Sequence, residues 1–137
     1  MSSSSVRRKK SISLTFRGFN LRAEEVVALV GVAASSFGNQ GEQVKPSVQT
    51  RLTRSYAIFS LDFLDDFDLC EMLPVLLTRL GGIDHLCQMQ SRIQPEFSEI
   101  EFDLPATSSA ESQDGYLTTT AIAQTLQLGA SISFSFS

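Results

Sequence analysis

Residues 11–17 read SISLTFR, and apolar and polar side chains alternate without a break through this stretch. Successive side chains of an extended chain point to opposite faces, so the apolar members share one face and the polar members share the other. We therefore predict a strand over residues 12–16 that buries one face only. The residues on the buried face are Ile12, Leu14 and Phe16.

Three further segments have strand character. Residues 54–61 contain aromatic and β-branched side chains, which strands favour. Residues 99–104 and 132–136 alternate in the same way as the first strand. In the segment 99–104 the apolar residues fall on one face, and three carboxylates fall on the other, exposed face: Glu99, Glu101 and Asp103.

Helices are predicted between these strands from apolar residues at steps of three and four. The first covers residues 20–30, with Asn20 as its N-cap and Gly31 at its end. Residues 83–93 predict a short helix, and residues 118–128 predict another that ends at a glycine.

The clearest helix covers residues 68–80, because its leucines form one continuous apolar stripe. Asp68 and Glu71 have the spacing of a capping box, in which two side chains satisfy backbone donors at the helix start. Pro74 lies past the first turn and predicts either a kink or a later start.

The order of these elements predicts the fold class. Strands with one buried face, alternating with helices, indicate an α+β fold. We expect a two-layer sandwich, in which a sheet of about four strands carries three to four helices mainly on one face. Residues 33–46 and 105–115 are rich in polar and turn-forming residues and predict surface loops.

Charge is distributed unevenly along the chain. Its 137 residues suffice for one domain. The net charge of −4 combines 11 basic with 15 acidic residues, but four basic residues stand together at positions 7–10. The remaining 7 basic and 15 acidic residues give −8 over residues 11–137. We predict a disordered basic arm over residues 1–10 and a single α+β domain over residues 11–137. Affinity for nucleic acid depends mainly on Lys and Arg, so no nucleic-acid partner is expected.

The sequence also bears on the compartment. No stretch approaches the ~20 apolar residues of a bilayer-spanning helix, and the first residues lack the apolar region of a signal peptide. We expect no membrane association and a cytoplasmic location. Cys70 and Cys87 fit a reducing compartment as small buried side chains, and a disulfide between them is also compatible with the sequence.

Three groups of residues suggest chemistry. Five acidic residues between positions 62 and 71 lack the alternation and the mid-loop glycine of an EF-hand, so stabilisation of a helix start is favoured over a calcium site. His85 and Cys87 point to different faces of a helix, and the sequence has no second histidine for a zinc site. Residues 38–41 read GNQG without the lysine of a phosphate loop. We expect no catalytic residues, no metal site and no cofactor.

Several segments occur in an order that resembles a known family. They are ISLTF and LRAEEVVALVGV near the start, SYAIFSL and EMLPVLLTRLGG in the middle, and TAIAQTLQLGASISFSF at the end. Over about residues 11–136 the layout resembles the bacterial family called domain of unknown function 4279. Tyr56 stands where members often carry Trp, and Phe136 stands where Tyr is more usual. The resemblance implies the fold and a bacterial cytoplasmic origin, and it supplies no catalytic residues.

Two classes of function are consistent with these observations. The first is a non-catalytic protein-binding domain, such as an immunity protein, in which Glu99, Glu101 and Asp103 meet a basic toxin. A homo-oligomer is the other partner considered. The alternative is a small-ligand-binding protein or an enzyme, with a pocket under the 33–46 loop and with Arg54 and Tyr56 as contacts.

Overall fold

The computed structural model describes residues 9–45, 47, 49–105 and 115–136. Along the chain these residues form β1 (Lys9–Arg17), α1 (Ala23–Val30), β2 (Ser36–Gly38), β3 (Tyr56–Leu64), α2 (Leu69–Arg79), α3 (Ile83–Ile93), β4 (Phe97–Leu104), α4 (Thr119–Leu128) and β5 (Ala130–Phe136). The predicted α+β class is confirmed, with five described strands where about four were expected.

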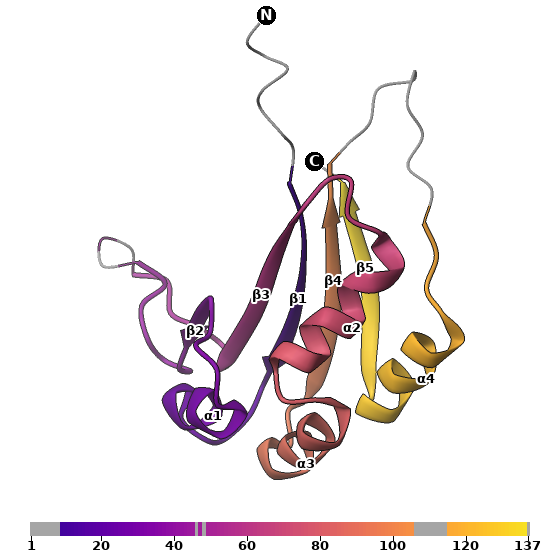
Figure 1. The fold of residues 1–137 in the computed structure, drawn as a ribbon. Helices are drawn as coiled ribbons and strands as arrows, with labels where there is room; N and C mark the ends of the chain where they lie inside the picture. The colour runs from indigo at the N-terminus through magenta and orange to yellow at the C-terminus, as the bar shows by residue number, and fades with distance from the viewer. Residues whose placement is uncertain (1–8, 46, 48, 106–114, 137) are drawn as a thin grey trace, which may run out of the picture.

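The strands form one open sheet in the order β2-β3-β1-β4-β5. β1 pairs antiparallel with β3 and β4, whereas β5 lies parallel to β4. Figure 1 shows α2 crossing in front of the sheet, with α1, α3 and α4 toward one end of the strands. The segment with the strictest alternation is therefore the central strand, with a neighbour on each side.

The core lies between the helices and one face of the sheet. On β1 the predicted residues Ile12, Leu14 and Phe16 are fully buried. Phe16 meets Phe59 of β3 edge to face, with ring centroids 6.5 Å apart. The leucine-rich stripe of α2 covers this layer through Met72, Leu73, Leu76 and Leu77. Burial of the alternate residues on one face of each strand leaves their polar neighbours on the opposite face.

The first strand begins earlier than the sequence suggested. We predicted that Lys9 and Lys10 belong to a disordered arm, but both lie in β1, where they pair with Leu64 and Phe63. Lys10 points to the helix-covered face and is only 7% exposed. Its aliphatic stem is long enough to continue the apolar row of the strand, which explains how a lysine is accommodated there. The rest of the predicted arm, residues 1–8, lies outside the described residues.

The predicted 33–46 loop contains a short strand that the sequence did not indicate. β2 pairs antiparallel with the start of β3 and so forms one edge of the sheet. Beyond it, the chain makes a narrow ribbon in which the Leu52 N–H donates to the Glu42 carbonyl and Gln43 bridges Arg51. Three residues are too few for a periodic pattern, so β2 depends on its partner strand rather than on local preference.

The helix starts differ from the predicted ones in detail. α1 begins at Ala23 with Arg22 in the N-cap position, so the prediction of Asn20 as the N-cap is wrong. α2 begins at Leu69, and the Asp68 side chain makes no capping hydrogen bond, so the capping box with Glu71 is absent. Pro74 lies inside this helix without delaying its start.

Candidate functional site

The face of the sheet opposite the helices carries the polar half of each alternating strand, and we call it the open face. The strand register places its side chains in five rows. The rows are Leu64 and Lys9; then Asp62, Ser11, Asp103 and Ser135; then Ser60, Ser13, Glu101 and Ser133; then Ser36, Ile58, Thr15, Glu99 and Ser131; and last Tyr56, Arg17 and Phe97.

Three of the predicted site residues form an acidic stripe along β4. This stripe, which comprises Glu99, Glu101 and Asp103, has hydroxyl-bearing residues of β1 and β5 on both sides. The Ser135 hydroxyl donates to Asp103 Oδ1 at 3.1 Å. Among the residues that the structure describes, none of the three carboxylates forms an ion pair. The stripe therefore presents negative charge that no cation in the described part of the chain pairs with.

The last row of the open face has the opposite character. The Arg17 guanidinium carbon lies 5.6 Å from the centre of the Tyr56 ring and 5.9 Å from that of Phe97, so a cation lies between two aromatic faces. Phe97 is 43% exposed. The Tyr56 hydroxyl is 3.0 Å from the Ser36 hydroxyl, which fixes the ring toward β2. One end of the open face thus offers an apolar and cationic contact beside the acidic stripe.

Arg54 lies just before β3 and reaches the same end of the sheet. Its Nε donates to Glu96 Oε1 at 3.1 Å, and its guanidinium carbon is 6.0 Å from the centre of the Phe97 ring. Arg54 also lines an open pocket of about 270 Å³ together with Gly18, Phe19, Asn20, Gln40, Thr53, Ser55 and Glu96. Tyr56 is not among the residues that line this pocket.

The five predicted residues are nevertheless neighbours in the fold. Tyr56 and the acidic stripe share the open face, and Arg54 stands at its end. Sequence reasoning missed Arg17 and Phe97, which complete the aromatic row. The alternation of residues 11–17 did place Arg17 on the polar face, but the row itself depends on a register between strands that are distant in sequence.

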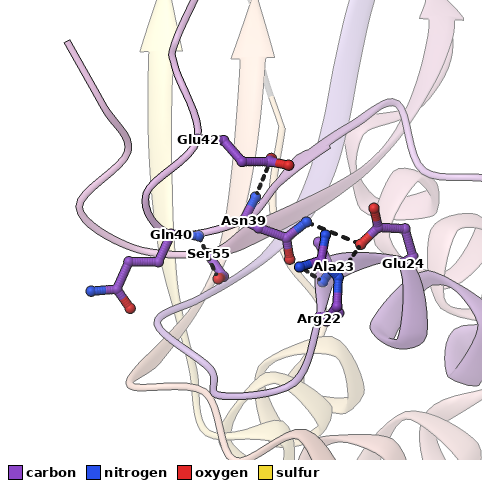
Figure 2. Close-up of polar contacts among 7 residues, drawn as sticks. All are labelled: Arg22, Ala23, Glu24, Asn39, Gln40, Glu42 and Ser55. Carbon is purple, nitrogen blue, oxygen red and sulfur yellow. Dashed lines mark hydrogen bonds and ion pairs between the residues drawn. The ribbon is translucent and has the colours of Figure 1, made fainter. Parts of the chain in front are cut away.

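The glycine-rich segment at residues 38–41 has a structural role, which Figure 2 shows. Asn39 is 6% exposed, and its side chain points at the start of α1. Its Oδ1 accepts from the Ala23 N–H at 2.7 Å, and its Nδ2 donates to Glu24 Oε1 at 3.0 Å. Its own N–H donates to Glu42 Oε1 at 2.8 Å. Asn39 therefore caps α1 from 16 residues away, in place of the predicted Asn20.

This cap also affects an acidic group. The hydrogen bond from Asn39 is the largest cause that lowers the pKa of Glu24, and the nearby Arg22 contributes in the same direction. The Arg22 Nε lies 3.5 Å from Glu24 Oε1. A donor that favours the charged form holds the carboxylate ionised at lower pH than usual.

His85 and Cys87, the candidate base and nucleophile, contact different helices. The His85 Nε2 lies 3.1 Å from the carbonyl oxygen of Val30 in α1, whereas the Cys87 sulfur contacts the carbonyl of Gln127 in α4. Removal from water, and secondarily the charge of Asp84, raises the pKa of the Cys87 thiol, which opposes formation of a thiolate nucleophile. Cys70 and Cys87 are both free thiols, so the disulfide alternative does not occur.

No group of three or more His, Cys, Asp or Glu side chains in residues 9–45, 47, 49–105 and 115–136 is arranged to hold a metal ion. Within the same ranges, no helix combines the length and the apolar character needed to cross a bilayer.

Comparisons with protein-family models, with curated proteins and with solved structures found no match to this chain. The resemblance to the domain of unknown function 4279 family stays a prediction from the sequence. What can be said of function therefore depends on the open face itself.

Proposed function

We propose that this chain is a non-catalytic protein-binding domain, of the immunity type that neutralises a toxin, and that its open face receives a basic partner. The observation that supports the proposal is the acidic stripe. Glu99, Glu101 and Asp103 lie on one strand and have no ion-pair partner among the described residues.

The position of the stripe favours recognition by a rigid surface. β4 is paired on both sides, by β1 and by β5, so its carboxylates are carried on fixed backbone. Alternate residues of a strand lie about 7 Å apart, a spacing that basic side chains on one strand or helix face of a partner can match. Complementary charge of this kind mainly raises the rate of association and selects the partner.

The aromatic row supplies the other half of such an interface. Protein interfaces combine apolar aromatic contacts with charged groups at their margins. Phe97 is partly exposed beside Arg17, one row away from Glu99. A partner that covers the stripe can therefore bury the Phe97 ring as well.

The alternative, a small ligand held beside Arg54, is less well supported. The pocket there is open and is lined mostly by polar groups. Its Arg54 guanidinium already pairs with Glu96 at 3.1 Å, so the charge that would attract an anion is partly neutralised. We therefore favour the open face over this pocket.

The proposal can be tested by affinity capture with the purified chain as bait. Wild-type protein should retain a basic protein from the source cells, and the E99Q/E101Q variant should lose it. Since charge steers association, the on-rate of the retained protein should fall at least about ten-fold in the variant and should fall with added salt.

A matched control removes the same number of carboxylates from exposed helix positions. The E25Q/D84N variant changes Glu25 of α1 and Asp84 of α3, both exposed, and leaves the open face intact. It should retain the partner as the wild type does. Equal loss of binding in both variants, or equal retention in both, would contradict a role for the open face.

A further inference from the structure

The C-terminal part of the chain contains no charged residue from Gly115 to Ser137. This uncharged segment includes α4 and β5. Ten large hydrophobic side chains are exposed among the described residues, and half of them belong to it. They are Tyr116, Ile122, Leu126, Phe134 and Phe136. The absence of charged residues, together with exposed aromatic and aliphatic side chains, is typical of the centre of a protein interface.

β5 is also an edge strand. In the described sheet it has β4 on one side and no strand on the other. An unprotected edge offers unpaired backbone groups to another chain, and proteins commonly block such edges with charges or proline. The sequence ASISFSF of β5 has neither.

At this edge, apolar side chains on the helix-covered face of the sheet are only partly covered and remain exposed. Phe134 stacks on the buried Phe102 with ring centroids 5.1 Å apart, yet Phe134 is 47% exposed. Phe136, two residues further along the same face, is 63% exposed. On the neighbouring helix α4, Leu126 is 80% exposed.

We infer that the free edge of β5 binds a second copy of this chain, with the two β5 strands antiparallel about a two-fold axis. An axis perpendicular to the sheet keeps the helix-covered faces of both copies on one side. The apolar row of β5 then joins the same row of the copy, and its serines join the serines of the copy. The product is a continuous sheet with one apolar and one polar face.

Charge identifies a second copy as the occupant. Residues 11–114 carry −8, so two copies repel each other over most of their surface. At the β5 edge, two uncharged strands separate the acidic stripe of one copy from that of the other. With strands about 4.8 Å apart, the two β4 strands are about 14 Å from each other, beyond the screening length of about 8 Å at physiological salt. A basic foreign protein finds no counter-charge on this surface.

Sedimentation equilibrium between 1 and 500 µM tests the inference. The wild type should show a concentration-dependent species of twice the 15.0 kDa chain mass. L126E and F136E place like charges in the interface at exposed positions, and each should raise the dissociation constant at least ten-fold. V75E, at a 40% exposed position on α2, is the matched control and should dimerise as the wild type does.

Hydrogen exchange adds a readout that is specific to strand pairing: amides of β5 should exchange more slowly as the concentration rises. Circular dichroism confirms that each variant is folded. A wild type that remains monomeric at 500 µM would overturn the inference. So would a dimer that persists unchanged in both L126E and F136E, or one without concentration-dependent protection in β5. None of these outcomes affects the open-face proposal, because the E99Q/E101Q test concerns a different surface.

Discussion

Asn39 shows how a single buried residue can connect a helix start to a distant loop. Its side chain caps α1 at the Ala23 N–H and donates to Glu24, and its backbone N–H donates to the Glu42 carboxylate. Ala23 and Glu24 begin α1, and Glu42 lies three residues after Asn39 in the chain, as Figure 2 shows. A buried amide with all these bonds made stabilises the fold, whereas loss of its side chain leaves buried groups without partners.

The first prediction concerns this cap. N39A should lower the free energy of unfolding by about 1–3 kcal/mol, because it removes a helix cap and leaves the buried Ala23 N–H without its acceptor. N20A should change it by less than about 0.5 kcal/mol, since Asn20 is exposed and does not occupy the N-cap position. Urea unfolding of both variants measures the difference. Equal effects of the two substitutions would refute the assignment of the cap.

The second prediction is a pH dependence. The pKa of Glu24 is lowered in the folded state, chiefly by Asn39, so Glu24 contributes stability above its unfolded pKa of about 4.3 and loses it as pH falls through the folded pKa. E24Q lacks this contribution. The difference in unfolding free energy between wild type and E24Q should therefore shrink as pH is lowered from 6 to 3. Urea unfolding at each pH checks this, and a constant difference would contradict it.

At the scale of elements, two helices have a cap-forming residue at the N-cap position, but only one of the two side chains makes the capping hydrogen bond. Thr118 caps α4, and its Oγ1 accepts from the Ala121 N–H at 3.0 Å. Asp68 occupies the same position before α2 but makes no such bond. The capping-box spacing of Asp68 and Glu71 is thus compatible with a helix start without the reciprocal hydrogen bonds, because an acidic side chain also interacts with the helix dipole.

The third prediction follows from this contrast. T118A should cost about 1 kcal/mol of stability because a capping hydrogen bond is lost. D68A should cost less, since only a dipole interaction of about 0.3–1 kcal/mol is removed. Thermal and urea unfolding of the two variants give the comparison. A larger loss for D68A than for T118A would contradict the described caps.

The fourth prediction concerns the start of β1. A variant lacking residues 2–10 should be less stable than one lacking residues 2–8, by about 1–2 kcal/mol, because it also loses the pairing of Lys9 and Lys10 with β3 and the buried stem of Lys10. Parallel urea titrations of the two truncations measure this difference. Equal stabilities would place Lys9 and Lys10 outside the fold after all.

Local pattern predicted the elements well where side chains alternate or recur over many residues. β1, β4, α2 and α4 were predicted with ends within two or three residues of those observed. β2 was missed because three residues carry no period, and the Asn39 cap was missed because it acts across 16 residues. The rows of the open face depend on strand order, which a single sequence does not reveal.

At the scale of the whole molecule, the chain separates two kinds of surface. The open face carries the acidic stripe, and the uncharged segment carries the free edge of β5. The sequence predicted that Glu99, Glu101 and Asp103 share one face, and the structure adds Arg17 and Phe97 to it. The concentration of exposed hydrophobic side chains at the β5 edge required the structure, since exposure is a property of the packed fold.

Chemical-shift mapping of the ¹⁵N-labelled chain, titrated with a lysine-rich peptide, tests most directly whether the open face receives basic partners. We expect the largest amide shifts in residues 99–103 of β4 and in the adjacent residues 11–13 of β1, and weaker binding by E99Q/E101Q. The competing acidic surface comprises residues 62–71. Shifts concentrated in residues 62–71, with the amides of β4 unchanged, would contradict binding of basic partners at the open face.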